Sequence, residues 1–380
     1  MSKILKAHHK LHKIPARTPE WHLFRRRSGL GGSDVGAAVG DNPYFSRWHL
    51  WETKVGLRND NLEPNEKILH GLIDENQTAK LWGYYDGYVN DSGVPTYVDR
   101  YMQILENPKD RELRTLLRQR RSERVNGVVT HSSYPWLFMN LDRIIPAGQF
   151  SFKPGRVPLE THAPLECKSM GEFVGRHYDE SIPPYYHSQG HSYMILLDTD
   201  YVEFAVRLGL SLQVKPFLFD RDYADRLLAE TYDFWHRYVV PAQAYMERRE
   251  QLLASQDYRG AEIIEGQMRE HEPPPDGTSL SLDYRKERIA VEQGGTGDRK
   301  GDQFTATLDN THDMFSLGIE LLDISSAKKV TEAKETKIKD EMLAFFRNTG
   351  MNKLDFGASG YISYYPNKNG VFTLRNQIKV

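Results

Sequence analysis

Five side chains of this sequence could together carry out the hydrolysis of a phosphodiester bond. They are Glu75, Asp142, Glu166, Lys168 and Gln189, in that order along the chain. Carboxylate oxygens are the ligands that hard divalent cations prefer. A lysine beside such a cation can stabilise the negative charge that develops on a phosphate in the transition state. The residue types are therefore those that a metal-dependent phosphodiesterase needs.

The lysine and one carboxylate lie two residues apart in the stretch Leu165, Glu166, Cys167, Lys168. In a β-strand, successive side chains point to opposite faces. Glu166 and Lys168 would then share one face, while Leu165 and Cys167 anchor the strand on the other. The spacing predicts a carboxylate and an ammonium group side by side at the edge of a sheet.

Asp142 follows the apolar run PWLFMNL and precedes RII, which we expect to continue the same strand. Residues 146–164 hold several prolines and glycines, a composition typical of a long connection between two paired strands. Residues 201–208 alternate between apolar and polar side chains, with Tyr201, Glu203 and Arg207 on one side. This alternation predicts a half-buried strand.

Two helices are predicted to bring the remaining polar groups. Glu75 lies on a helical face with Ile68, Leu72, Ala79 and Trp82. A carboxylate on an apolar face is costly unless a metal ion or an opposite charge compensates it. Gln189 shares a face with aromatic and aliphatic residues in a helix that we expect to begin at the prolines 183–184.

A basic and glycine-rich motif occurs near the N-terminus. Gly31 and Gly32 precede Ser33, which we expect to be the N-cap of a short helix, and Arg25 and Arg26 lie just before them. The N-terminus of a helix attracts anions. A phosphate pocket and a purely structural turn beside a solvated basic patch both remain open. The histidine-rich start, KAHHKLHK, is expected to be a disordered basic arm rather than a metal site.

Composition sets further bounds. The net charge of −2 gives no global signal for nucleic-acid binding, so lysine and arginine would have to concentrate along a channel. The single cysteine excludes an intrachain disulfide framework and a four-cysteine iron–sulfur cluster made by this chain alone. No apolar run approaches the length that spans a membrane, and we expect a cytoplasmic protein.

The last third carries no catalytic constellation. A charged helix is expected within 319–347, and the end of the chain predicts a β-hairpin whose turn is Asn369-Gly370. The expected organisation is a basic arm over 1–17, a catalytic domain over 18–245 with an insertion at about 91–124, and an extension over 246–380. A loop at about 271–303 would interrupt that extension.

The order of these motifs resembles that of the YqaJ-type phage recombinases, relatives of the phage lambda exonuclease within the PD-(D/E)XK nuclease superfamily. The resemblance rests on TPEWHLFRRRSGLGGSDVGAAVGDNPYFSRWHLWETKVG, Gly71-x-x-x-Glu75, YPWLFMNLDR, LECKS, IPPYYHSQ and a later FW pair. One departure is His191, where the family usually has a second glutamine after Gln189. The resemblance implies an α/β fold: a restriction-endonuclease-like core with a central mixed sheet flanked by helices, and a C-terminal helix plus β-hairpin extension.

The resemblance also implies roles for these residues. Asp142, Glu166 and the backbone carbonyl of Cys167 would hold Mg²⁺ or Mn²⁺, with Glu75 supporting the same metal directly or through water. Lys168 would position the attacking water, and Gln189 would orient the water or the lysine. Ser33 and either Arg25 or Arg26 would grip a terminal 5′ phosphate.

The implied activity is digestion of duplex DNA from its 5′ ends, which leaves a 3′ single strand for a single-strand annealing protein. The family's ring-shaped trimer makes a homo-oligomer an expectation by resemblance alone. Two alternatives remain open on the same core: a structure- or site-specific endonuclease, and a DNA-end-binding module without catalysis.

Overall fold

The computed structural model divides the chain into two compact units, residues 1–295 and 296–380, and each is described by itself. The structure describes residues 5–58, 66–152, 156–171, 182–209, 211–274, 276 and 280–284 of the first unit, and parts of 319–377 in the second. Among these residues, no helix is long and apolar enough to cross a membrane.

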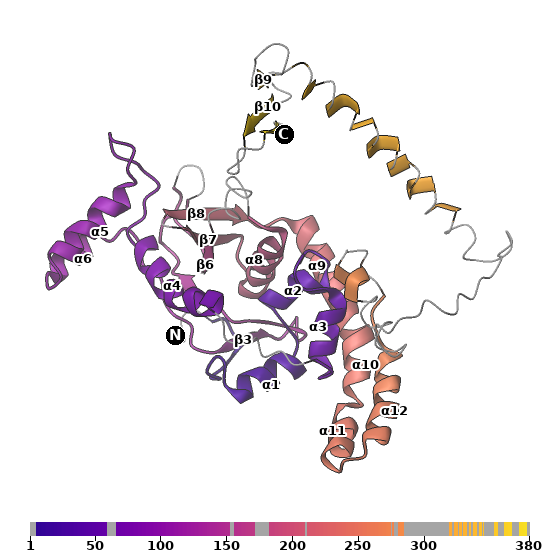
Figure 1. Ribbon diagram of the computed structural model, residues 1–380. Coiled ribbons are helices and arrows are strands. Elements are labelled where there is room, and N and C mark those ends of the chain that lie inside the picture. Colours follow the sequence, from indigo (N-terminus) through magenta and orange to yellow (C-terminus); the bar gives the residue numbers. More distant parts are fainter. Residues whose placement is uncertain are drawn as a thin grey trace. The chain divides into compact units, whose positions relative to one another are not determined.

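A four-stranded mixed sheet lies at the centre of the first unit (Figure 1). Its order is β5 (Arg143–Ile145), β6 (Ala163–Met170), β7 (Tyr201–Leu208) and β8 (Ser211–Leu218). The β6–β7 pair is parallel, and the two outer pairs are antiparallel. The expected central mixed sheet is therefore confirmed, with the Glu166 strand as an inner member.

Helices α4 (Glu66–Trp82) and α8 (Pro184–Leu197) cover opposite faces of this sheet. Tyr201 and Ala205 of β7 pack with Trp82 of α4, whereas the alternate residues, such as Phe204, pack with Met194 of α8. The crossover from β6 to its parallel neighbour β7 runs through α8, as a parallel connection requires. Two helices that carry candidate residues are thus fixed on either side of the Glu166 strand.

The expected strand over residues 201–208 is confirmed as β7, but the expectation that it is half buried is wrong. Strand β7 lies between two neighbours and under two helices, so even Glu203 is fully buried. Its carboxylate accepts hydrogen bonds from Arg120 at 2.7 Å, Trp82 at 2.7 Å and Tyr201 at 2.6 Å. The alternation of polar and apolar residues therefore reflects a buried charge pair and its hydrogen bonds rather than a solvated face.

A second sheet has the order β1 (His9–His12), β3 (Val128–His131), β4 (Leu137–Met139) and β2 (Leu30–Gly31). Two expectations are corrected here. The arm is not disordered throughout, because β1 pairs antiparallel with β3. The run before Asp142 and the RII after it are not one strand either, since β4 and β5 belong to different sheets. Asp142 lies at the corner between them.

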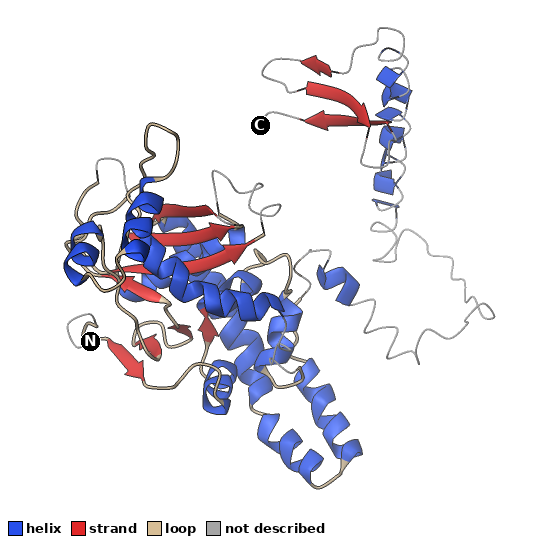
Figure 2. Cartoon of the chain, turned by 60° about the vertical axis from the view of Figure 1, so that its left-hand side comes forward, coloured by secondary structure: helices blue, strands red, loops and turns tan. Residues whose placement is uncertain are grey.

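Helices make up most of the rest of the first unit. They are α1 (Pro19–Arg27), α2 (Gly32–Ala38), α3 (Arg47–Lys54), α5 (Thr96–Glu106), α6 (Arg111–Leu117), α9 (Arg221–Asp233), the π-helix η1 (Phe234–Val239), α10 (Val240–Gln243), α11 (Met246–Ala254) and α12 (Tyr258–Arg269). Helices α5 and α6 lie within residues 91–124, where the sequence predicts an insertion, and are placed beyond α4 (Figure 1). Helices α11 and α12 run side by side as a hairpin (Figure 2).

The second unit contains a three-stranded antiparallel sheet, β11 (Phe372–Gln377), β10 (Tyr361–Pro366) and β9 (Lys353–Asp355). The expected C-terminal hairpin is confirmed and gains β9 as a third strand. Its Asn369-Gly370 turn and most of the expected loop at 271–303 lie outside the described residues. Within the expected charged helix, residues 323–325 and 337–339 are helical.

His191 has a structural function in α8. Its Nδ1 lies 3.1 Å from the carbonyl oxygen of His187, and its Nε2 accepts a hydrogen bond from the Asp220 amide at 3.0 Å. Asp220 is the N-cap of α9, so the ring joins α8 to the start of the next helix. Burial lowers the pKa of His191 to about 4. The departure from the family glutamine therefore introduces a buried neutral imidazole.

This imidazole makes the fold sensitive to acid. Because the pKa of His191 is depressed on folding, its contribution to the free energy of unfolding is present above about pH 6.5 and is lost as the pH falls towards 4. We expect His191→Gln to remove about 3 kcal/mol of this pH dependence, because glutamine can form both bonds without titrating. Urea unfolding at several pH values measures it, with exposed His70→Gln as control. Equal acid losses in wild type and His191→Gln would contradict this role.

Candidate active site

Glu166 and Lys168 face the same side of β6, as the strand alternation predicts. The Lys168 ammonium donates to Glu166 Oε2 at 2.8 Å, and the Glu166 side chain is almost completely buried. Leu165 and Cys167 pack in the apolar cluster on the α4 side. Burial would lower the pKa of Lys168, but the carboxylates of Glu166 and Asp142 outweigh it and raise this pKa well above its usual value. Lys168 is therefore a cation held against two acids.

Asp142 reaches the same place from the corner between the two sheets. Its Oδ2 accepts a hydrogen bond from the Cys167 amide at 2.9 Å, and its own amide lies 3.5 Å from Glu166 Oε1. Burial, together with the charge of Glu166, raises the pKa of Asp142 to about 8. The two carboxylates repel each other in a poorly solvated site, and the single ammonium of Lys168 does not offset both.

Gln189 lies on α8 and contacts Glu166 from that helix. Its Nε2 donates to Glu166 Oε2 at 2.9 Å and lies 3.1 Å from the hydroxyl of Tyr193. The Tyr193 hydroxyl donates in turn to the backbone carbonyl of Asn140 at 3.3 Å, two residues before Asp142. Sequence reasoning placed Tyr193 only on the Gln189 face. The structure shows that it links α8 to the corner that carries Asp142.

Glu75 lies on α4 and shares a cavity with Asp142. The cavity has a volume of about 570 Å³, and both carboxylates line it together with residues 13–16, which follow β1. Glu75 Oε1 accepts a hydrogen bond from Arg124 at 3.1 Å, so an arginine compensates the carboxylate that interrupts the apolar face. The structure thus brings Glu75, Asp142, Glu166, Lys168 and Gln189 into one neighbourhood.

The residues next to Glu75 fix its helix over the sheet. Asp74 accepts hydrogen bonds from Ser169 at 2.8 Å and from Arg207 at 2.6 Å, which ties α4 to the ends of β6 and β7. Asn76 accepts one from Arg143 at 2.8 Å, which ties α4 to β5. These contacts were not predicted, although the run of polar residues Asp74, Glu75 and Asn76 in the middle of α4 is a signal that could have pointed to them.

The N-terminal motif is built around a buried carboxylate that sequence reasoning missed. Asp34 accepts from Arg25 at 2.6 Å, from Lys54 at 2.7 Å and from the Gly31 amide at 2.9 Å. Burial alone would raise the pKa of Asp34, but Arg25 and Lys54 lower it to about 2. Two cations thus share one carboxylate, which leaves a net positive charge beside Ser33.

The expected N-cap is corrected to Gly31, because α2 begins at Gly32 and Ser33 lies inside its first turn. A Cβ atom on Gly32 would lie 2.4 Å from the Tyr193 ring, so the close packing of α2 on α8 requires glycine there. The Ser33 side chain is exposed and accepts a hydrogen bond from Arg25 at 3.1 Å. Of the two candidate arginines, Arg25 is therefore the one hydrogen-bonded to Ser33.

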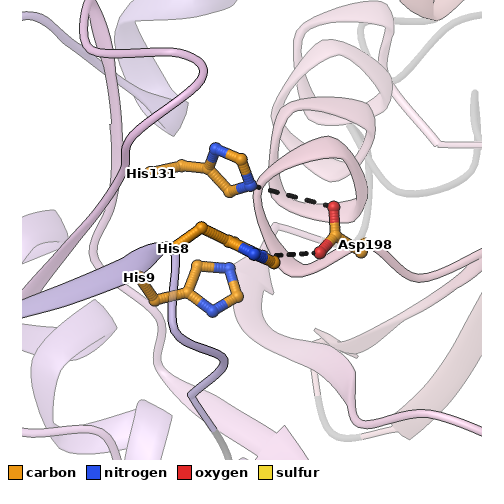
Figure 3. Close-up of side chains that lie close together, drawn as sticks. All are labelled: His8, His9, His131 and Asp198. Atoms are coloured by element: carbon orange, nitrogen blue, oxygen red, sulfur yellow. Dashed lines mark ion pairs between the residues drawn. The ribbon is translucent and has the colours of Figure 1, made fainter.

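Three histidines and an aspartate gather where β1 meets the end of α8 (Figure 3). The His8 ring lies 2.7 Å from Asp198, the His131 ring lies 3.8 Å from it, and the Lys6 ammonium donates to it at 3.0 Å. The group has metal-ligand side chains, with ligand atoms within 4.8 Å of one another. His9, however, is hydrogen-bonded at both nitrogens, to the Lys6 amide and the Leu196 carbonyl, so we assign the group a structural role.

The carboxylate site fits a hard divalent cation. Asp142, Glu166 and Glu75 supply several oxygens, and burial together with repulsion from Glu166 raises the pKa of Asp142. A divalent cation would offset that repulsion and keep Asp142 ionised at neutral pH. Oxygen donors in this number suit Mg²⁺ or Mn²⁺.

Comparison with known proteins agrees with this arrangement. Residues 20–201 match the model of the YqaJ-like viral recombinase domain. Over 327 residues the chain is 24% identical to the uncharacterized protein YqaJ of Bacillus subtilis strain 168, and the match covers 85% of this chain and 77% of that protein.

Solved structures give more distant similarities. The alkaline exonuclease LHK-Exo of Laribacter hongkongensis is 14% identical, with a TM-score of 0.38, over 64% of this chain and 99% of that one. The same enzyme in complex with dAMP is 13% identical, with a TM-score of 0.37 and the same coverage.

The mixed sheet and its flanking helices form an α/β core, and this core holds Asp142, Glu166 and Lys168 close together. Residues 20–201, just under half of the chain, are thus similar to the YqaJ-like viral recombinase domain. The resemblance to the YqaJ-type recombinases, which the order of the motifs predicted, is thereby confirmed.

Proposed function

We propose that this protein is a metal-dependent deoxyribonuclease that degrades linear duplex DNA from its 5′ ends. One observation supports the proposal most strongly: the buried carboxylate of Glu166 is hydrogen-bonded to both Lys168 and Gln189. The backbone amide of Asp142 lies next to the other oxygen of the same carboxylate. The resulting 3′ strand would serve a single-strand annealing protein, and the enzyme would work as a ring-shaped homo-oligomer, both as the family resemblance implies.

In this proposal, Asp142, Glu166, the Cys167 carbonyl and Glu75 hold Mg²⁺ or Mn²⁺. The bound ion would polarise the scissile phosphate and lower the pKa of a water ligand. Lys168 remains protonated and donates hydrogen bonds towards the charge that develops on the phosphate oxygens. Gln189 holds Glu166 by its Nε2, so that both Glu166 oxygens keep a fixed direction towards the ion and the lysine.

Arg25 and Ser33 would bind the terminal 5′ phosphate. Their contact places a guanidinium beside a hydroxyl on the exposed side of α2. The Lys54 ammonium below them neutralises much of the Asp34 charge, which leaves Arg25 able to pair with an anion. A bidentate guanidinium contact with a phosphate would make the enzyme prefer phosphorylated 5′ ends.

End-labelled substrates test this proposal. We expect Mg²⁺-dependent release of a 5′ label from linear duplex, faster with a 5′ phosphate than with a 5′ hydroxyl. Arg25→Ala should lower that preference by about ten-fold or more, since a hydrogen bond to a charged group contributes about 1.5–3 kcal/mol. Arg27→Ala is the matched control, because Arg27 lies on the same helix and contacts Glu247 and Glu250 instead.

Three outcomes would contradict parts of the proposal. Internal cuts in closed circles would identify an endonuclease on the same core. Faster release from 3′ ends would reverse the polarity. Binding to DNA ends without cleavage in Mg²⁺ or Mn²⁺ would leave a non-catalytic end-binding module.

A further inference from the structure

A second cavity lies beside the insertion and has a volume of about 800 Å³. We call it the insertion groove. Its wall combines the end of α4, the helices α5 and α6, and the segment that follows α6. The side chains that matter for its chemistry are Lys80, Arg114, Arg118 and Arg121, with Tyr84 and Tyr101.

The groove is strongly positive although the whole chain carries a net charge of −2. Five of its lining residues are lysine or arginine, and none is aspartate or glutamate. Arg120 is neutralised by the buried Glu203. Within the described part of the chain, Lys80, Arg118 and Arg121 have no ion-pair partner. Such local concentration of cations is the electrostatic mark of a polyanion-binding surface.

The aromatic residues and the size of the groove indicate that its ligand is a single strand of nucleic acid. Tyr101 is partly exposed in the wall, and its ring packs edge-on against the buried Tyr84, with ring centroids 5.6 Å apart. Aromatic rings between cations form the stacking platform on which the bases of a single strand bind. The volume is that of a small-molecule site, about 300–1,000 Å³. A cavity of this volume accommodates about one or two nucleotides of one strand.

The wall of the groove is anchored to the nuclease core. On α5, the Tyr97 hydroxyl accepts a hydrogen bond from the Leu212 amide of β8 at 3.2 Å, and Arg100 pairs with the buried Asp86 at 2.5 Å. Tyr97 and Ile104 are buried in the α4-side apolar cluster. These contacts anchor α5, one side of the groove, to β8 and to the end of α4.

Basic residues continue from the groove towards the active site. Arg118, Arg121 and Arg124 recur at every third position after α6, and Arg124 lines the catalytic cavity and pairs with Glu75. On α4, Lys80 follows Glu75 by five residues, which is about 7.5 Å along the helix axis. A strand bound in the groove would therefore lie close to the catalytic carboxylates.

We propose that the insertion groove binds single-stranded DNA next to the active site. The inference rests on the proposed nuclease function only for the origin of that strand, which would be a strand separated from the duplex at the site of digestion. The binding itself follows from the charge, rings and volume of the groove.

Binding is measured by fluorescence anisotropy of a labelled oligothymidylate without 5′ phosphate, in EDTA, with the full-length protein. We expect Arg118→Glu with Arg121→Glu to weaken binding by at least about ten-fold and to reduce the salt dependence by a slope of about 1.4, as loss of two phosphate contacts predicts. The control is Lys109→Glu with Arg111→Glu, since both residues are exposed next to the groove but do not line it. Wild-type affinity and salt slope in the groove variant would overturn the inference.

A second variant removes stacking without changing charge. Tyr101→Leu keeps a shorter apolar side chain without a ring and should weaken binding by about 5- to 150-fold, the range of losses on removing one stacking ring. Circular dichroism and thermal unfolding check that each variant is folded. Unchanged affinity in folded Tyr101→Leu would contradict the stacking platform, even if the charge variant fails to fold.

Lys168→Ala separates this inference from the proposed function. It should bind the oligothymidylate as wild type does and cleave duplex DNA about 10²–10³-fold more slowly. Groove-dependent binding in a wild-type protein that cleaves nothing would refute the nuclease and support the groove. Cleavage of duplex DNA by a protein whose strand binding does not depend on the groove would support the nuclease and refute the groove.

Discussion

Replacing Lys168 with alanine is expected to lower the rate of duplex hydrolysis by about 10²–10³-fold, with DNA binding retained. The ammonium is hydrogen-bonded to Glu166 and is kept protonated by two carboxylates, so it is the cation available to the reacting phosphate. Single-turnover release of a 5′ label in Mg²⁺ measures the chemical step, and anisotropy in EDTA measures binding.

The control is Lys109→Ala, an exposed lysine in the turn between α5 and α6. It should cleave at the wild-type rate. Lys168→Arg is also informative: the charge is retained, but the planar guanidinium does not reproduce the compact ammonium, and activity should stay low. A wild-type rate of cleavage by Lys168→Ala would show that Lys168 takes no part in the chemical step.

The second large effect concerns Asp142→Asn, which should abolish metal-dependent cleavage and stabilise the metal-free fold at alkaline pH. Burial and Glu166 raise the pKa of Asp142 to about 8. A carboxyl group whose pKa is raised on folding contributes stability that is present below about pH 4 and is lost as the pH rises through about 8. Asparagine carries no charge, so the variant should lack this loss.

Thermal unfolding in EDTA across that pH range measures the effect, with exposed Asp91→Asn as control. Adding Mg²⁺ should raise the melting temperature of the wild type more than that of Asp142→Asn, because a ligand stabilises the state that binds it. If the two proteins lose stability equally from pH 4 to 8, Asp142 does not carry the excess charge.

Local pattern sufficed for much of the site. Strand alternation placed Glu166 and Lys168 on one face, and helical periodicity placed Glu75 and Gln189 on faces that meet the sheet. Both periodicities depend on a few neighbouring residues, so they can be recognised from the local sequence alone. The glycine-asparagine signal for the C-terminal hairpin is local in the same way.

The errors arose where distant segments decide the outcome. Glu203 was assigned to solvent because its partner Arg120 is 83 residues away in the sequence. The Ser33 N-cap failed because Asp34 binds Lys54 and Arg25 instead of leaving the turn to the serine. Likewise, a continuous strand through Asp142 is a reasonable local expectation, but β4 and β5 pair with partners in different sheets.

The pairing of β1 with β3 has a consequence for synthesis on the ribosome. His9 pairs with His131, so β1 leaves the exit tunnel more than a hundred residues before its partner strand. At about 5–20 residues per second, that interval is roughly 6–24 s. Residues 13–16, which follow β1, line the catalytic cavity, so that cavity cannot close until β3 has emerged. The lysines and histidines of this segment keep an unpaired strand soluble during the delay.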